Sequence, residues 1–329
     1  MVDTQEHDVK LAGVAETTLW TLYHRALDAR DPNTALNDPK AVELADSISF
    51  PFESRFGSGN WGQAQGTGLR ARCFDTEVRR FLADHPEGTV VSLGEGLETQ
   101  FWRVDNGSVR WLSVDLPDVA AVRKRLLPDT DRRRTLACSV TDGSWLAEVD
   151  DARGLLITAQ GVLMYLSPAE AHALIAACAD HFPGAALVFD TPPQWVTGRT
   201  VRRQWRYPAG YQPPPMPWGM TSAEEEKLRG LPKVAGVRSV RVPRGRGLVC
   251  GLLLPALSYV PGLRSRKPLW VTRVDFLADE ERPAEADAAQ QDQQIRNAPA
   301  HPPRKVTVDE RASAGNKLHT WTAGAAGEE

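Results

Sequence analysis

Residues 89–99 read Thr-Val-Val-Ser-Leu-Gly-Glu-Gly-Leu-Glu-Thr. An apolar run typical of a buried strand leads directly into a Gly-x-Gly turn at Gly94 and Gly96. Glycine lets the backbone approach a ligand closely, and open α/β sheets bind ligands at the carboxyl ends of their strands. A Gly-x-Gly turn on its own is equally consistent with a structural role, so it needs a second matching feature.

Asp115 supplies that second feature. It ends the next predicted strand, 21 residues after Gly94, and this fits the ~20-residue offset of an acid that binds ribose hydroxyls. Both dinucleotide-dependent enzymes and S-adenosylmethionine (SAM) methyltransferases use such an acid. The sixth motif position is Thr99 rather than the Gly or Ala that lets a dinucleotide-binding helix pack closely on its strand. The pattern therefore favours SAM and disfavours an NAD-dependent oxidoreductase.

Apolar runs typical of strands alternate with helical segments from residue 89 onward. These runs lie at 89–93, 111–114, 135–140, 155–158 and 186–189, with further candidates at 234–242 and 269–276. Such alternation is typical of parallel strands joined by crossover helices. The sequence therefore predicts an α/β fold whose sheet is mostly parallel.

Helical patterns precede the first of these strands. Apolar residues fall at helical spacing from Leu11 to Ala26, Asp38-Pro39 is a helix start, and 69–83 is another helix, with the glycine-rich run 57–68 as a break. We expect an N-terminal helical cap at 1–85 and a SAM-binding core at 86–279. Within this core, the segment rich in Pro, Arg and aromatic residues at about 194–232 is predicted to be an inserted lid. Residues 280–329 are poor in large apolar side chains and are predicted to form a disordered tail.

Composition narrows the classes of partner. The 329 residues contain 39 Lys plus Arg and 42 Asp plus Glu, so no global basic field indicates nucleic acid. No apolar run approaches the ~18 residues of a membrane span, and the charged N-terminus does not resemble a signal peptide. The four cysteines show no metal-ligand spacing. We expect a cytoplasmic protein without a metal that acts on a small molecule, and a homo-oligomer is left open.

Several ordered motifs resemble the leucine carboxyl methyltransferase family, within it the bacterial branch of tetracenomycin-type polyketide carboxyl O-methyltransferases. The resemblance covers about residues 10–278. It rests on RARCFD at 70–75, VVSLGEGLETQFWR at 90–103, WLSVDLPDVAAVRKRLL at 111–127, SVTDGSW at 139–145, QGVLMYL at 160–166 and PPMPWGM at 214–220. Together these motifs are far more specific than the glycine turn.

The resemblance implies a doubly wound, mostly parallel sheet of the class I SAM-dependent methyltransferase type, with a cofactor site for SAM. It implies that Arg70 holds the methionine carboxylate, which suits the planar guanidinium fork, and that Asp115 takes the ribose hydroxyls. Gly94 and Gly96 would line the backbone of the cofactor, and Ser139, Val140 and Asp142 would surround the adenine. From the residues alone, Asp142 is more readily a helix cap. Arg25 on the first helix either assists Arg70 or belongs to a solvated face, and the solvated face is slightly favoured.

The sequence departs from the family at two charged positions. The family run Leu-Asp-Thr-Arg is Leu-Glu-Thr-Gln at 97–100, and the acid that opens the E-x-V-L-M-Y-L motif is Gln160. A carboxylate stabilises a nearby sulfonium or ammonium, so its loss at 160 is expected to weaken cofactor binding or to make room for an anionic acceptor. A SAM-fold protein that has lost transfer and serves as an accessory of a biosynthetic assembly therefore stays as an alternative.

Candidate residues for the acceptor lie downstream. Tyr165, just past the fourth core strand, and Gln160 are the candidate catalytic residues, and Trp195, Arg199 and Trp218 are the candidate substrate-binding residues. If the segment after Gln194 is helical, Arg199 and three further arginines at 202, 203 and 206 form one cationic stripe. No side chain stands out as a general base, which favours an already ionised carboxylate over a phenol. We therefore expect an O-methyltransferase that acts on a carboxylate or phenolic oxygen of an aromatic or polyketide-like metabolite.

Overall fold

A computed structural model describes residues 7–247 and 269–278. The described residues all belong to one compact unit. The predicted tail at 280–329 lies outside the described residues, and the division into cap, core and tail stays a prediction.

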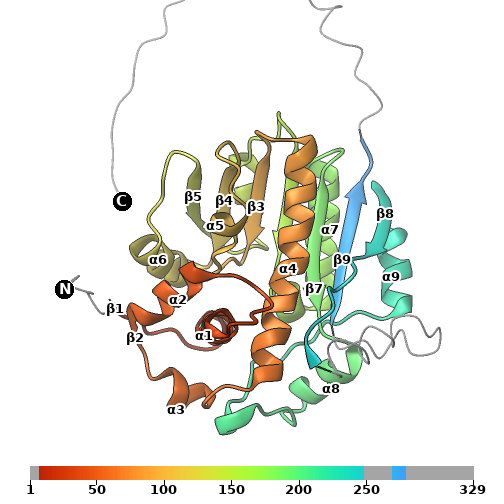
Figure 1. The fold of residues 1–329 in the computed structure, drawn as a ribbon. Coiled ribbons are helices and arrows are strands. Elements are labelled where there is room, and N and C mark those ends of the chain that lie inside the picture. Colours follow the sequence, from red (N-terminus) through yellow and green to blue (C-terminus); the bar gives the residue numbers. More distant parts are fainter. Residues whose placement is uncertain (1–6, 248–268, 279–329) are drawn as a thin grey trace, which may run out of the picture. The chain divides into compact units, whose positions relative to one another are not determined.

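The described part of the chain folds around a seven-stranded sheet (Figure 1). The strands are β3 (Thr89–Leu93), β4 (Arg110–Asp115), β5 (Arg133–Ala137), β6 (Leu155–Ala159), β7 (Ala186–Thr191), β8 (Val234–Ser239) and β9 (Trp270–Phe276). Their order is β5-β4-β3-β6-β7-β9-β8. Six of these strands run in one direction, and β9 runs opposite to them. The α/β class and the mostly parallel sheet are confirmed.

Helices precede the sheet and connect its strands. The first group is α1 (Thr17–Arg30), α2 (Pro39–Asp46), α3 (Phe52–Phe56) and α4 (Trp61–Asp84), with a short pair of strands, β1 (His7–Asp8) and β2 (Ile48–Ser49). The connections contain α5 (Gln100–Val104), α6 (Pro117–Leu126), η1 (Gly143–Glu148), η2 (Leu163–Tyr165), α7 (Pro168–His181), α8 (Gln194–Val201), η3 (Pro208–Gly210) and α9 (Ser222–Arg229). As predicted, Asp38 caps α2 by accepting from the Ala41 N–H at 3.1 Å.

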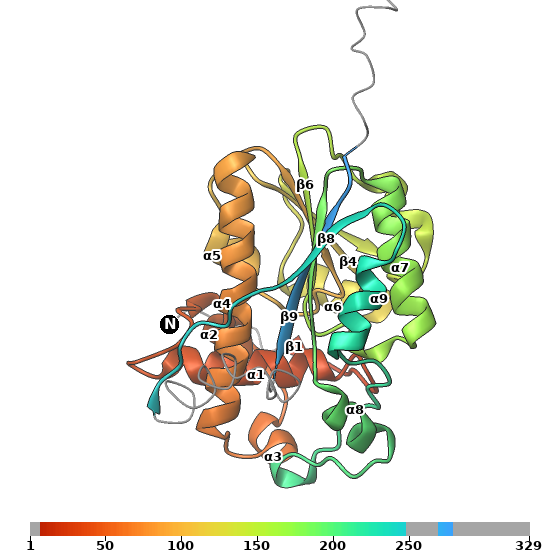
Figure 2. The ribbon, with the colours of Figure 1, turned by 90° about the vertical axis from the view of Figure 1, so that its right-hand side faces the viewer.

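Apolar side chains on alternate strand positions pack against different helices, because successive residues of a strand face opposite sides. Val91, Leu93 and Ile157 belong to a core with α7 and α9, while Val90 and Leu156 belong to a core with α4 and α5. Figure 2 shows α4 on one side of the sheet and α7 and α9 on the other. These layers leave the carboxyl ends of the strands to the loops and to α1.

The glycine-rich run 57–68 separates helices only at its start, which corrects part of the sequence prediction. Gly57 ends α3, whereas Gly62, Gly66 and Gly68 lie inside α4, which starts at Trp61 rather than at Leu69. Gly68 lies where α1 and α4 cross closely, because a Cβ atom on it would lie 2.6 Å from Asp28 Oδ2. Close helix crossing and helix breaking both favour glycine, so composition alone does not separate them.

We expect Gly68→Ala to destabilise the fold by about 1–3 kcal/mol, because the added methyl group forces α1 and α4 apart. Gly66→Ala in the same helix is the matched control, since a Cβ there meets nothing within 4 Å. The control should stabilise the protein by about 0.5–1 kcal/mol through helix propensity. Urea unfolding of both variants measures the difference, and equal effects would contradict the close crossing.

The arginine stripe predicted for the lid does not form. Helix α8 ends at Val201, and Arg203 has a positive φ of 57°, so the backbone leaves the helix before the third and fourth arginines. The ends of the inserted segment are held together instead, because Met220 N–H donates to the Pro192 carbonyl at 3.3 Å. Residues 193–219 thus form a loop that leaves the sheet and returns at one place.

Candidate active site

The glycine turn after β3 is closed by helix α1. Gly94 and Gly96 both have φ of +57°, a conformation that glycine adopts without strain. A Cβ on Gly96 would overlap the side chain of Thr18, whose Oγ1 accepts from the Leu97 N–H at 2.7 Å. The turn therefore requires glycine both for its backbone conformation and for the approach of α1.

A buried ion pair between Glu95 and Arg123 stabilises the glycine turn. Glu95 points into the protein and pairs with Arg123 of α6 at 2.9 Å, and both side chains are fully buried. Arg123 also donates to the carbonyl oxygens of Gly96 at 2.7 Å and Glu98 at 3.0 Å. The carbonyls of the turn are thereby satisfied, which holds the loop in one conformation.

Asp115 lies at the end of β4 beside this turn. Its Oδ2 accepts from the Gly96 N–H at 2.6 Å and its Oδ1 from the Leu116 N–H at 2.8 Å. Burial raises the pKa of this carboxyl, and the two backbone N–H groups oppose the rise. The turn and the acid, singled out separately in the sequence, thus form one unit.

Arg70 of α4 reaches the ends of β6 and β7. Its Nη1 lies 3.5 Å from Asp190 Oδ2, and Asp190 Oδ1 accepts from the Gly161 N–H at 2.6 Å. Burial raises the pKa of Asp190, and Arg70 opposes the rise. The buried Arg70 Nε has no hydrogen-bond partner among the described residues. Arg70 is thus anchored and still has a donor to offer.

Gln160 and Glu98 meet beside Arg70. Gln160 Nε2 donates to Glu98 Oε2 at 3.0 Å, and Glu98 pairs with Arg25 and Arg103, each at 2.8 Å. Burial favours a raised pKa for Glu98, but the two arginines outweigh it and lower the pKa to about 2. Glu98 is therefore ionised at neutral pH.

Glu98 belongs to a larger buried ion cluster. Arg103 also pairs with Asp38 at 2.6 Å and Asp75 at 2.9 Å, and Gln100 donates to Asp75 at 3.1 Å. Gln100 thus joins the cluster as a neutral donor, at the position where the resemblance leads one to expect an arginine.

Arg25 corrects an interpretation based on sequence. The pattern of the first helix favours a solvated position for Arg25, but its side chain is 1% exposed. It pairs with Glu98, lies 3.5 Å from Asp38, and donates to the Leu97 carbonyl at 2.7 Å. An amphipathic pattern cannot reveal a buried arginine whose partners lie about 70 residues away in the sequence.

The adenine candidates follow β5. Asp142 accepts from the Ser144 N–H at 3.0 Å and caps η1, as the sequence alone favoured. The Val140 carbonyl accepts from Trp145 Nε1 at 3.0 Å, which ties the loop to the core. Ser139 contacts the Thr141 hydroxyl at 2.8 Å. Leu116, next to Asp115, is 43% exposed and adds an apolar surface that the sequence analysis did not single out.

Tyr165 lies among aromatic side chains from α1 and the inserted loop. It forms a hydrogen bond with Thr17, and Tyr207, Tyr211 and Arg70 are close enough to influence its pKa. Burial raises the pKa of all three tyrosines. The Trp20 ring lies 5.0 Å from Tyr207, between ring centroids. These hydroxyls are therefore neutral donors at pH 7.

The three substrate candidates separate in the structure. Trp195 is 46% exposed, and the Arg199 guanidinium lies 5.6 Å above its ring, so they form a surface pair on α8. Trp218 is 2% exposed, stacks on Phe189 and donates to Glu224 at 2.9 Å. The structure places Trp218 in the core, where it ties the inserted loop to α9, and a role for it in substrate binding stays a prediction.

His172 lies in the same cluster as Trp218. Its Nε2 is 2.5 Å from Glu224 Oε1, and its ring meets Trp218 edge to face. This contact joins α7 to α9.

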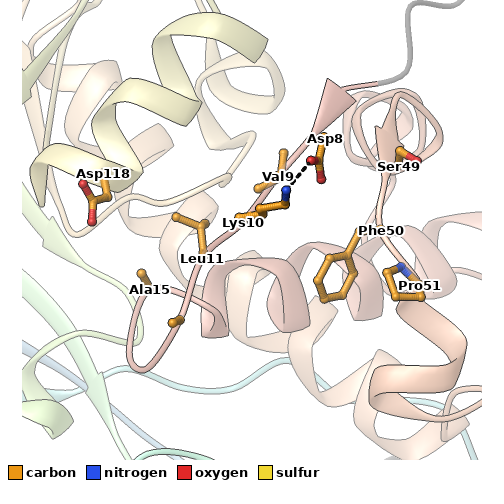
Figure 3. Close-up of a pocket in the computed structure, with 10 residues that line it drawn as sticks. Asp8, Val9, Lys10, Leu11, Ala15, Ser49, Phe50, Pro51 and Asp118 are labelled. Atoms are coloured by element: carbon orange, nitrogen blue, oxygen red, sulfur yellow. Dashed lines mark ion pairs between the residues drawn. The ribbon is translucent and has the colours of Figure 1, made fainter.

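A cavity of about 540 Å³ lies elsewhere, between the segment before α1 and the start of α6 (Figure 3). Leu11 and Ala15 line one side, Phe50 and Pro51 another, and Asp118 stands across the gap. The predicted site residues do not line it. The candidate site is therefore defined by the polar groups at the carboxyl edge of the sheet and not by this cavity.

The constellation fits SAM. It offers an unpartnered arginine donor for a carboxylate, a buried acid at the β4 end for ribose hydroxyls, and an ionised glutamate near the position of the positive groups. SAM supplies a sulfonium methyl as the electrophile, and the protein aligns the acceptor with it. Fold and site together define a class I SAM-dependent methyltransferase.

Comparison with known proteins identifies the family. A family model for leucine carboxyl methyltransferase matches residues 18–179. The tetracenomycin polyketide synthesis O-methyltransferase TcmP of Streptomyces glaucescens is 38% identical over 189 residues, which cover 57% of this chain and 69% of that protein. A SAM-dependent methyltransferase of Gibberella zeae, dpfgK, is 28% identical over 202 residues, covering 56% and 68%. The chain belongs to the leucine carboxyl methyltransferase family.

Solved structures give weaker matches. The CurJ carbon methyltransferase aligns with a TM-score of 0.44 and 12% identity, covering 80% of this chain and 68% of that one. Within the residues that the structure describes, no helix is both long and apolar enough to span a membrane. The protein is a SAM-dependent methyltransferase. The candidate site is held by five further charged residues that the sequence did not point to, namely Glu95, Arg123, Glu98, Arg103 and Asp190.

Proposed function

We propose that the protein transfers the SAM methyl group to an oxygen of an aromatic or polyketide-like metabolite, with a carboxylate favoured over a phenol. The observation that carries this proposal is the group of three tyrosines at 165, 207 and 211, which lie close enough to interact electrostatically and, for Tyr165 and Tyr207, to interact with Arg70, so that they can donate hydrogen bonds to an anionic oxygen. A neutral hydroxyl donates a hydrogen bond and does not remove a proton at pH 7. Such a site suits an acceptor that is already ionised.

The aromatic surroundings support an aromatic acceptor. Rings of Trp195, Trp205, Tyr207 and Trp20 follow one another at centroid distances of 5.8, 6.1 and 5.0 Å. Planar acceptors gain from offset or edge contacts with such rings. The similarity to TcmP, whose name refers to polyketide synthesis, supports the same class.

Residue roles follow from the geometry as proposals. We assign the cofactor to Arg70, Gly94, Gly96, Asp115, Ser139, Val140, Asp142 and Gln160. Tyr165 is assigned to the acceptor oxygen, and Trp195 with Arg199 to the entrance of the site. The loop after residue 193 would cover the acceptor.

The test uses radiolabelled SAM with 2-naphthoate and 2-naphthol, which share the same ring system. We expect label in a product from 2-naphthoate that mild alkali releases as methanol, because an ester hydrolyses and an aryl ether does not. Tyr165→Phe should lower the rate by about tenfold, the effect of losing one hydrogen bond to a charged oxygen. If label appears only in an alkali-stable product from 2-naphthol, the acceptor is a phenol and the proposed carboxylate acceptor is wrong.

A further inference from the structure

The side-chain amide of Gln160 has one satisfied end and one free end. Its Nε2 donates to Glu98 Oε2, whereas the buried Oε1 has no hydrogen-bond partner among the described residues. An ionised carboxylate only accepts hydrogen bonds, so the amide must turn its NH₂ group toward Glu98. The carbonyl oxygen then faces away from Glu98.

Glu98 cannot easily move from this position. Its Oε1 accepts from Arg103 and from the Thr99 N–H at 3.0 Å, while Oε2 accepts from Arg25 and Gln160. Both oxygens are therefore engaged by groups on α1, α5 and the loop after β6. The orientation of the Gln160 amide is imposed by a carboxylate that is itself held from several directions.

A second unpartnered atom belongs to Arg70, whose guanidinium contacts the loop that holds Gln160. Gly161 follows Gln160, and a Cβ on Gly161 would lie 3.2 Å from Arg70 Nη1, so the Arg70 guanidinium is adjacent to this loop. Arg70 Nε is buried and unpartnered in the described part of the chain. An acceptor and a donor are thus available around Gly161, which matches the ammonium and carboxylate of a zwitterionic amino-acid group.

We propose that Glu98 is a positioning residue that fixes the Gln160 amide so that its carbonyl oxygen accepts from the ammonium group at the amino-acid end of the cofactor. The inference rests on the proposed assignment of Arg70 and Gln160 to the cofactor. It also explains why residues 100 and 160 are both glutamine. The family pattern has a cation at one and an acid at the other, so replacing both leaves the local charge unchanged.

A carboxylate at 160 would therefore be unfavourable in this chain. It would stand beside Glu98, and the nearby cations Arg25 and Arg103 already serve three acids, at 38, 75 and 98. Like charges in a buried site repel strongly. A carboxylate usually tightens the binding of a cationic ligand, but in this site we expect Gln160→Glu to weaken it.

The experiment compares S-adenosylhomocysteine with 5′-methylthioadenosine, which keeps the nucleoside but lacks the amino-acid end. Calorimetry on Gln160→Leu and Glu98→Gln is expected to show about tenfold weaker S-adenosylhomocysteine binding, the loss of one charge-assisted hydrogen bond, with methylthioadenosine unchanged. The double variant should bind S-adenosylhomocysteine no more weakly than either single variant, because both substitutions remove the same contact.

Asp75→Asn is the matched control. It weakens the same ion cluster without touching Gln160, so the ratio of the affinities for S-adenosylhomocysteine and methylthioadenosine should stay at the wild-type value.

Gln160→Glu provides a test that leaves the ion pairs of Glu98 in place. We expect it to weaken S-adenosylhomocysteine binding, and tighter binding would overturn the proposal. Equal losses for both ligands in Glu98→Gln, or additive losses in the double variant, would also overturn it. If the wild-type protein bound neither ligand, the assignment of the cofactor site itself would fail, which is a distinct outcome.

Discussion

Replacing Arg103 with Met is expected to destabilise the protein by about 3–5 kcal/mol, because it leaves buried carboxylates without their cation. Arg103 is 5% exposed and pairs with Asp38, Asp75 and Glu98. Methionine retains the apolar stem, so the change removes charge more than volume. Urea unfolding at pH 7 measures the loss.

The loss should depend on pH in a defined direction. The arginines hold the pKa of Glu98 at about 2, below its ordinary 4.5. A depressed pKa contributes stability that is present above the ordinary pKa and is lost as pH falls through the native value. The wild-type advantage should thus be largest above pH 5 and shrink between 4.5 and about 2.

Arg79→Met is the control for this experiment. Arg79 lies 3.9 Å from Asp75 but is 55% exposed, so the pair is screened by solvent. A surface pair of this kind contributes about 0–1 kcal/mol. Similar losses for both arginines would show that the buried cluster is no stronger than a surface pair.

The sequence predicted the elements whose signals are local. All seven strands were located, since buried parallel strands appear as continuous apolar runs, although the run at 135–140 ends as a strand at Ala137. The pairing of Gly94 with Asp115 followed from a fixed spacing that the sheet topology imposes. These features depend on neighbours in sequence or on one crossover.

The sequence could not predict features that depend on long-range contacts. The close approach of α1 to Gly68 and the burial of Arg25 both arise from helix crossing, and neither has a periodic signature. Asp190 was overlooked even though, like Asp115, it is an acid at the end of an apolar strand. Its position at the end of a strand could have identified Asp190 as a site residue from the sequence. The partners of Glu98 lie on three separate segments, so its role required the fold.

Asp115→Ala is expected to weaken the binding of SAM and S-adenosylhomocysteine alike by at least tenfold. Both ligands carry the same ribose, and each hydrogen bond to a charged acceptor contributes about 1.5–3 kcal/mol. The change also frees the Gly96 N–H, which donates to Asp115 at 2.6 Å, so the glycine turn loses its anchor. Calorimetry with both ligands measures the effect.

Arg70→Ala is the comparison for Asp115→Ala, because it tests the amino-acid end of the cofactor separately from the ribose. Arg70 lies by Gly161 at the ends of β6 and β7, whereas Asp115 ends β4 on the other side of β3. Loss of Arg70 should therefore weaken S-adenosylhomocysteine but spare 5′-methylthioadenosine, which lacks the carboxylate. Loss of Asp115 should weaken both by a similar factor, because both contain the ribose. An Asp115→Ala variant that retained wild-type affinity for methylthioadenosine would place the ribose elsewhere, and the unit formed by the glycine turn and its acid would then have only a structural role.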